Sequence, residues 1–219
     1  MKRLFLSAGI AYAASVAMST TIAITSGTAD MTAVTYGAVG TFSLFGTGGS
    51  FTGAGHTLSS MPCVGYGCTG ITPVRVNAGL SSEEFDLSGT VSFGGNSTSY
   101  LERPGLGGGG GLHLGYTLPA FSTIGDPVFV TLTTPFTGDA GFLDPRFNGG
   151  QQLIMNGEGI ATITLSLISP GFPDGSPARY RFQSAHYEFV PEPGTAALML
   201  IGLVGWSAVT FARRDIRGS

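Results

Sequence analysis

Apolar and polar residues alternate with a period of two along much of this chain. In residues 85–93 every second residue is apolar or glycine, and the same alternation recurs in residues 112–118 and 161–167. This is the period of a β-strand that buries one face, whereas a helix repeats its apolar residues every three or four positions. The pattern predicts antiparallel strands with one solvated face.

Glycine strengthens the case against helices. The chain has 36 glycines in 219 residues, and each would destabilise a helix interior by about 1 kcal/mol relative to alanine. Pairs such as Gly48-Gly49 and Gly94-Gly95 separate the candidate strands, as turns require. We therefore expect an all-β domain, an antiparallel β-sandwich of which the jelly roll is one form.

The last candidate strand changes its phase. Tyr180 and Phe182 fall on one face, but Tyr187 and Phe189 fall on the other. One extra residue near Ser184 would bring all four to the same face, so we predict a β-bulge there.

The N-terminal end has the pattern of a signal peptide. A cationic start, Met1-Lys2-Arg3, precedes a largely apolar stretch over residues 4–18. We predict a signal helix within a signal peptide over residues 1–29, with the small residues Gly27 and Ala29 before the cleavage site. Cleavage after Ala17 or Ala23 and an uncleaved anchor are the alternatives.

The C-terminal end has three parts. Residues 191–194 read Pro-Glu-Pro-Gly, residues 196–212 carry no charge, and residues 213–219 contain Arg213, Arg214 and Arg217. The uncharged stretch would form a helix of about 26 Å, at the short limit for a membrane span. Arginine is costly in the bilayer, so the three arginines would stop transfer and stay cytoplasmic.

This arrangement resembles the PEP-CTERM sorting signal of Gram-negative bacteria, over residues 191–219. The resemblance implies that an exosortase recognises Pro191, Glu192 and Pro193 and removes the tail from an inner-membrane precursor. It also implies an exported protein at the cell surface or in the extracellular matrix, associated with exopolysaccharide and biofilm. The same segment is catalogued as an ice-binding-protein C-terminal type, a label that describes the tail alone. A plain single-span anchor is the alternative.

Residues 30–190 form the expected β-domain. They contain five Arg and eleven Asp or Glu, and such an acidic surface does not attract nucleic acid. Cys63 and Cys68 are expected to form a disulfide in an exported chain. Two free thiols, or part of a zinc site, are the alternatives.

No residues group as acid, base and nucleophile, so we expect a protein that is not an enzyme and has no cofactor or metal. The three histidines, His56, His113 and His186, are far apart in the sequence. Asp139 and Asp144, in an expected loop, could offer oxygens to calcium as an alternative. The predicted function is a non-enzymatic protein of the cell envelope or matrix. A glycan- or matrix-polymer-binding module with exposed tyrosines is the alternative.

Overall fold

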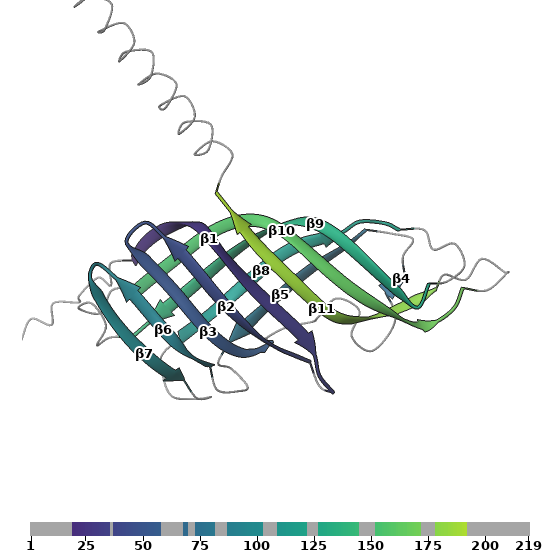
Figure 1. Ribbon diagram of the computed structural model, residues 1–219, viewed down its shortest axis with the longest axis horizontal. Helices are drawn as coiled ribbons and strands as arrows, with labels where there is room; N and C mark the ends of the chain where they lie inside the picture. Colours follow the sequence, from purple (N-terminus) through teal and green to yellow (C-terminus); the bar gives the residue numbers. More distant parts are fainter. Residues whose placement is uncertain are drawn as a thin grey trace, which may run out of the picture.

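The computed structural model describes nine segments of the chain. They are residues 19–35, 37–57, 68–69, 73–81, 87–102, 109–121, 127–144, 152–171 and 178–191. Every regular element in these segments is a β-strand (Figure 1). The strands are β1 Ser19–Ala33, β2 Ala38–Gly46, β3 Gly49–Thr57, β4 Cys68–Thr69, β5 Val74–Ser81, β6 Leu87–Phe93, β7 Asn96–Glu102, β8 Gly109–Leu118, β9 Phe129–Leu143, β10 Gln152–Ser169 and β11 Arg179–Val190.

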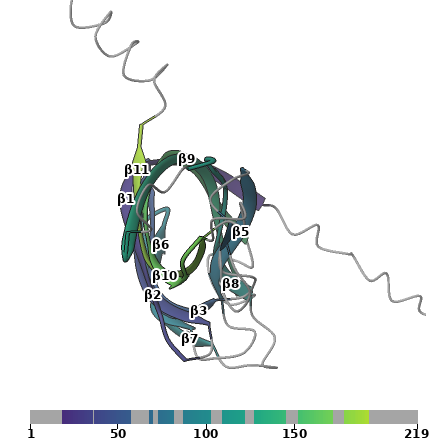
Figure 2. The ribbon, with the colours of Figure 1, turned by 90° about the vertical axis from the view of Figure 1, so that its right-hand side faces the viewer.

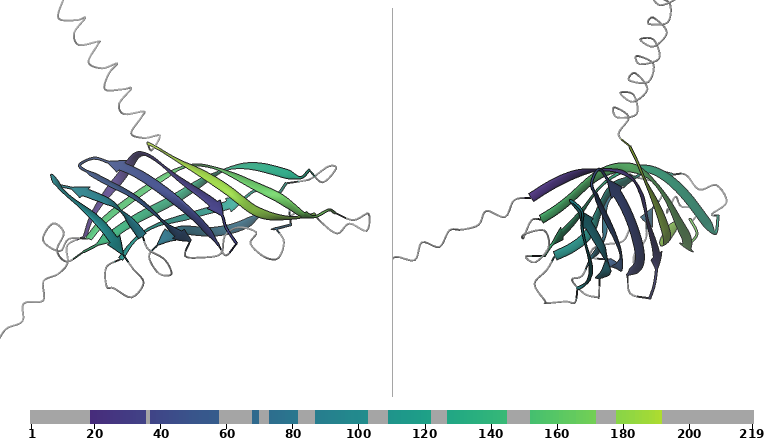
Figure 3. Two further views of the ribbon diagram at one scale, coloured as in Figure 1. Left: turned by 60° about the horizontal axis from the view of Figure 1, so that its bottom comes forward. Right: turned by 60° about the vertical axis from the view of Figure 1, so that its left-hand side comes forward.

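All of these strands belong to one sheet that curls round on itself (Figure 2). The order is β2-β1-β11-β10-β9-β8-β5-β3-β6-β7, and β4 pairs with β11. Because β3 also pairs with β2, the strands from β2 round to β3 close into a ring. Strands β6 and β7 extend the sheet beyond β3, and Figure 3 shows the curl from two further sides.

Strand β1 changes neighbours along its length. Residues 19–23 pair in parallel with β10, and residues 27–32 pair antiparallel with β11. Its pairing with β2 shifts register between Ile24 and Ser26. The shift lets Ile22 and Ile24 point to the same interior as Ala29 and Met31, although the two pairs differ in phase.

The interior of the ring is filled by side chains. Phe142 of β9 lies with its ring centroid 6.0 Å from that of Phe51 of β3, and Tyr116 of β8 lies 5.9 Å from Tyr187 of β11. Phe136 packs edge-on against Phe189 with their centroids 4.8 Å apart. Strands that are not neighbours in the sheet thus meet through aromatic contacts, which pack one continuous core.

The expectation of an all-β domain is confirmed, but the two-layer sandwich is wrong. Alternation reports which face of a strand is buried, and a curled sheet buries its inner face just as a sandwich does. The sheet also begins at Ser19, well before the expected domain start at Asp30.

The residues expected to form the two helices lie outside the part of the chain that the structure describes. Residues 1–18 and the predicted span over residues 196–212 are outside the described residues. Within the described residues there is no helix long and apolar enough to cross a membrane.

Several strand predictions are confirmed in detail. Strand β6 covers residues 87–93 of the first alternating segment, and β8 and β10 cover the other two. Leu87, Leu114 and Ile163 are buried as their phase requires. The register of β11 against β10 jumps from Phe182 to Ser184, which is the predicted bulge.

Candidate functional site

The chain leaves the sheet at the end of β11. Val190 pairs with Glu158 of β10, and the next residue, Pro191, is exposed and belongs to no strand. Phe189 is buried against Phe136, so the last inward-facing side chain before Pro191 is held in the core. No linker separates the folded domain from the start of the Pro-Glu-Pro motif.

The sheet itself explains this exit. Beyond Glu158, the edge of β10 is already paired with residues 19–23 of β1. A longer β11 would have no edge of β10 left to pair with, and proline lacks the N–H group that a sheet ladder needs. The first strand therefore determines where the last strand ends.

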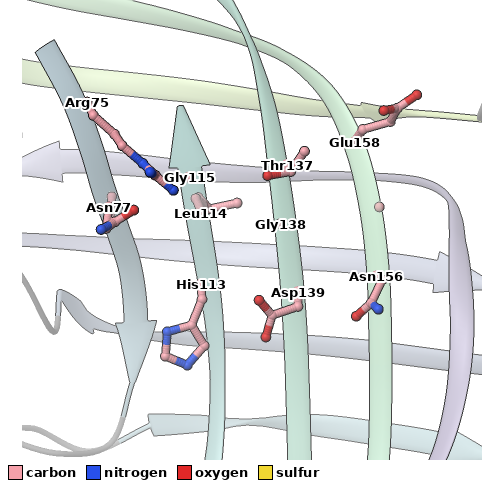
Figure 4. A pocket seen from close by; sticks show the side chains of 12 residues that line it. Arg75, Asn77, His113, Leu114, Gly115, Thr137, Gly138, Asp139, Asn156 and Glu158 are labelled. Carbon is pink, nitrogen blue, oxygen red and sulfur yellow. The ribbon is translucent and has the colours of Figure 1, made fainter. Parts of the chain in front are cut away.

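A second candidate is a polar groove on the outer face of β5, β8, β9 and β10 (Figure 4). It has a volume of about 800 Å³ and is open to solvent. Two rows of side chains cross the four strands, because His113 pairs with Asp139 and Gly115 pairs with Thr137. Gly115 has no side chain, which leaves space in the middle of the groove. A Cβ at this position would lie 3.7 Å from the Asn77 side-chain oxygen and would fill part of that space.

The groove combines hydrogen-bond donors with acceptors. Arg75 and Asn77 supply N–H groups from β5, while Asp139 and Glu158 supply carboxylate oxygens from β9 and β10. Within the described part of the chain, Arg75, His113, Asp139 and Glu158 form no ion pair with one another. Their side chains line the open groove, where a ligand that both donates and accepts hydrogen bonds could reach them.

His186 has a partner of its own on the neighbouring part of the outer face. Its Nδ1 atom lies 2.7 Å from the Asp30 carboxylate, which joins β11 to β1. His186 lies on β11 and His113 on β8, with β10 and β9 between them. Among the described residues there is no cluster of three or more metal-ligating side chains.

Other predicted site residues fall in different places. The glycan-binding alternative relied on exposed tyrosines, but Tyr100, Tyr116, Tyr180 and Tyr187 are buried. Asp139 lies in strand β9 and not in a loop, so the calcium alternative loses its premise. The groove was missed from sequence because its residues come from four strands whose pairing no local pattern reveals.

Most residues of the predicted sorting and disulfide sites lie outside the described residues. They are Glu192, Pro193, Arg213, Arg214, Arg217 and Cys63, together with the side chain of Cys68.

The fold and the exit of the chain define a class: an all-β domain joined without a spacer to a C-terminal segment. That segment is the PEP-CTERM protein-sorting motif, whose family model matches residues 189–217. The resemblance expected from Pro191, Glu192 and Pro193 is therefore confirmed, and the match begins at Phe189 within β11. Neither the curated proteins nor the solved structures gave a match to the chain.

Proposed function

We propose that this is an exported, non-enzymatic protein that an exosortase processes and leaves at the cell surface or in the exopolysaccharide matrix of a Gram-negative biofilm. The match of residues 189–217 to the sorting motif carries the proposal. The geometry supports it, because Pro191 is exposed directly after a strand that is paired along its length. A processing enzyme would meet the motif at the surface of a completed domain.

A non-enzymatic role agrees with the groove. Asp139 and His113 are exposed on an open sheet face, where water surrounds them. Enzyme active sites usually enclose the substrate and exclude water. An open polar face is better suited to binding.

The test compares the wild-type protein with a variant in which Pro191, Glu192 and Pro193 are all replaced by Ala. Both are produced in the native cells, and intact mass is measured after fractionation. We expect the wild type to lose the tail and leave the inner membrane, and the variant to keep the tail and stay there.

A matched control instead replaces exposed residues of β11 that lie before the matched motif, as in Arg181→Ala with Glu188→Ala. This control should be processed like the wild type. If the segment containing Arg214 persists equally in the wild type and in the Ala variant, the tail is an ordinary anchor and the exosortase proposal fails.

A second candidate function is the binding of a glycan or another matrix polymer in the groove. Hydroxyl groups both donate and accept hydrogen bonds, so they match the mixture of Arg75, Asn77, Asp139 and Glu158. The chain carries a net charge of −3, which favours a neutral or amine-bearing polymer over a polyanion.

Binding is tested with exopolysaccharide purified from the producing cells. The double variant Asn77→Ala with Asp139→Ala removes polar groups from two strands of the groove, and we expect roughly tenfold weaker binding from the lost hydrogen bonds. The control variant, Thr131→Ala with Ser99→Ala, changes exposed residues outside the groove and should bind like the wild type. Equal binding by all three proteins would argue against the groove as the binding site.

A further inference from the structure

Residues 19–29 are an integral part of the folded domain. They supply the parallel pairing with β10 and the start of the pairings with β2 and β11. Ile22 is 7% exposed and Ile24 is 3% exposed, and both belong to the core. Cleavage after Ala29 would remove these side chains and leave the edge of β10 over residues 152–156 unpaired.

Glycines on three other strands make room for this same segment. A Cβ at Gly46 would lie 2.6 Å from Ile22 Cγ2, and one at Gly49 would lie 2.7 Å from Ile22 Cδ1. A Cβ at Gly157 would lie 2.8 Å from Ile24 Cβ. Side chains at these three positions would force Ile22 and Ile24 to shift from their packed positions. The glycines at these three positions therefore leave the space that Ile22 and Ile24 occupy, which indicates that residues 22–24 remain in the mature protein.

We infer that signal peptidase cuts this chain between Ala17 and Met18, so that β1 is retained whole. Ser15 and Ala17 are the small residues that the positions before a cleavage site require. The apolar stretch over residues 4–14 then has the length of a signal-peptide core. Cleavage after Ala23 would separate Ile22 from Ile24, so the fold disfavours that site too.

This inference concerns export alone and does not depend on the exosortase proposal. Its test is N-terminal sequencing and intact mass of the full chain, recovered from the envelope of cells that produce it. We expect a new N-terminus at Met18. An N-terminus at Ile24, at Asp30 or at any other residue, the uncleaved Met1 included, would overturn the assignment.

A pair of variants tests the site itself. Ala17→Leu places a large residue before the cut, and the species that begins at Met18 should disappear. The matched control is Ala23→Leu, which changes an exposed residue of β1 and should be processed as the wild type is. Persistence of the Met18 N-terminus in Ala17→Leu, or its loss in Ala23→Leu, would contradict the assigned site.

Discussion

Single glycines determine how closely the strands of this ring can approach the side chains inside it. Gly157 of β10 faces the core, where a Cβ would lie 2.8 Å from Ile24 Cβ and 2.9 Å from Phe189 Cδ1. A Cβ at Gly141 of β9 would have no heavy atom within 4 Å. Neither glycine has a positive φ angle, so alanine causes no backbone strain at either position. The effect of each substitution on stability therefore depends on the space around the added methyl group.

We therefore expect Gly157→Ala to lower the free energy of unfolding by about 1–3 kcal/mol, the usual cost of overpacking a core. The control Gly141→Ala should be close to neutral. Urea unfolding followed by circular dichroism measures both.

The contact with Ile24 can be isolated by a double-mutant cycle. In an Ile24→Gly background, which removes the Cβ atom that the new methyl group would meet, Gly157→Ala should cost less than it does in the wild type. An equal cost in both backgrounds would show that the overpacking arises elsewhere.

At the scale of the element, the sequence predicts what is local and misses what is not. Strands β6, β8 and β10 and the bulge near Ser184 follow from alternation, because side-chain direction depends only on position along the strand. Alternation does not reveal strand β1, because Ala23 between Ile22 and Ile24 is itself apolar. The small residues Gly27 and Ala29 also fit a cleavage site, which favours a signal peptide over a strand.

The pairing of strands that are distant in sequence could not be predicted. The groove exists because Asn77 and Asp139 come from strands on either side of β8. Nothing near either residue in the sequence indicates that pairing, because it results from packing of the whole sheet. The sorting motif could be predicted because its three parts are contiguous in the sequence.

At the scale of the whole molecule, opposite sides of the ring are joined by buried polar groups as well as by apolar ones. The Tyr187 hydroxyl donates to the Tyr116 hydroxyl, 3.3 Å away, and both side chains are buried. Burial raises the pKa of Tyr187 to about 12, with the hydrogen bond to Tyr116 partly offsetting the rise. Burial also raises the pKa of Tyr116, and the charge of an ionised Tyr187 raises it further.

These shifts predict a loss of stability in alkali. Tyrosine in the unfolded chain ionises near pH 10, so above that pH the unfolded state binds fewer protons than the folded state. The stabilisation is complete below pH 10 and is lost as the pH rises towards 12, by up to about 1.4 kcal/mol per pH unit for each tyrosine. Urea unfolding at pH 9, 10 and 11 measures the slope.

The matched variant is Tyr116→Phe with Tyr187→Phe, which keeps the ring contacts and removes both ionisable groups. Its stability should fall less steeply between pH 10 and 11 than that of the wild type. Equal slopes for the two proteins would place the alkaline sensitivity in other groups.

The absence of a spacer before Pro191 has a mechanical consequence. A protein held by its C-terminal end would receive any pulling force directly on β11, which is hydrogen-bonded to β10 and β1 on its two sides. The bonds of an antiparallel ladder lie across the strand direction, so a load along β11 strains many of them together and does not peel them apart one at a time. The strand that presents the sorting signal is thus also well placed to bear tension at the surface of a cell.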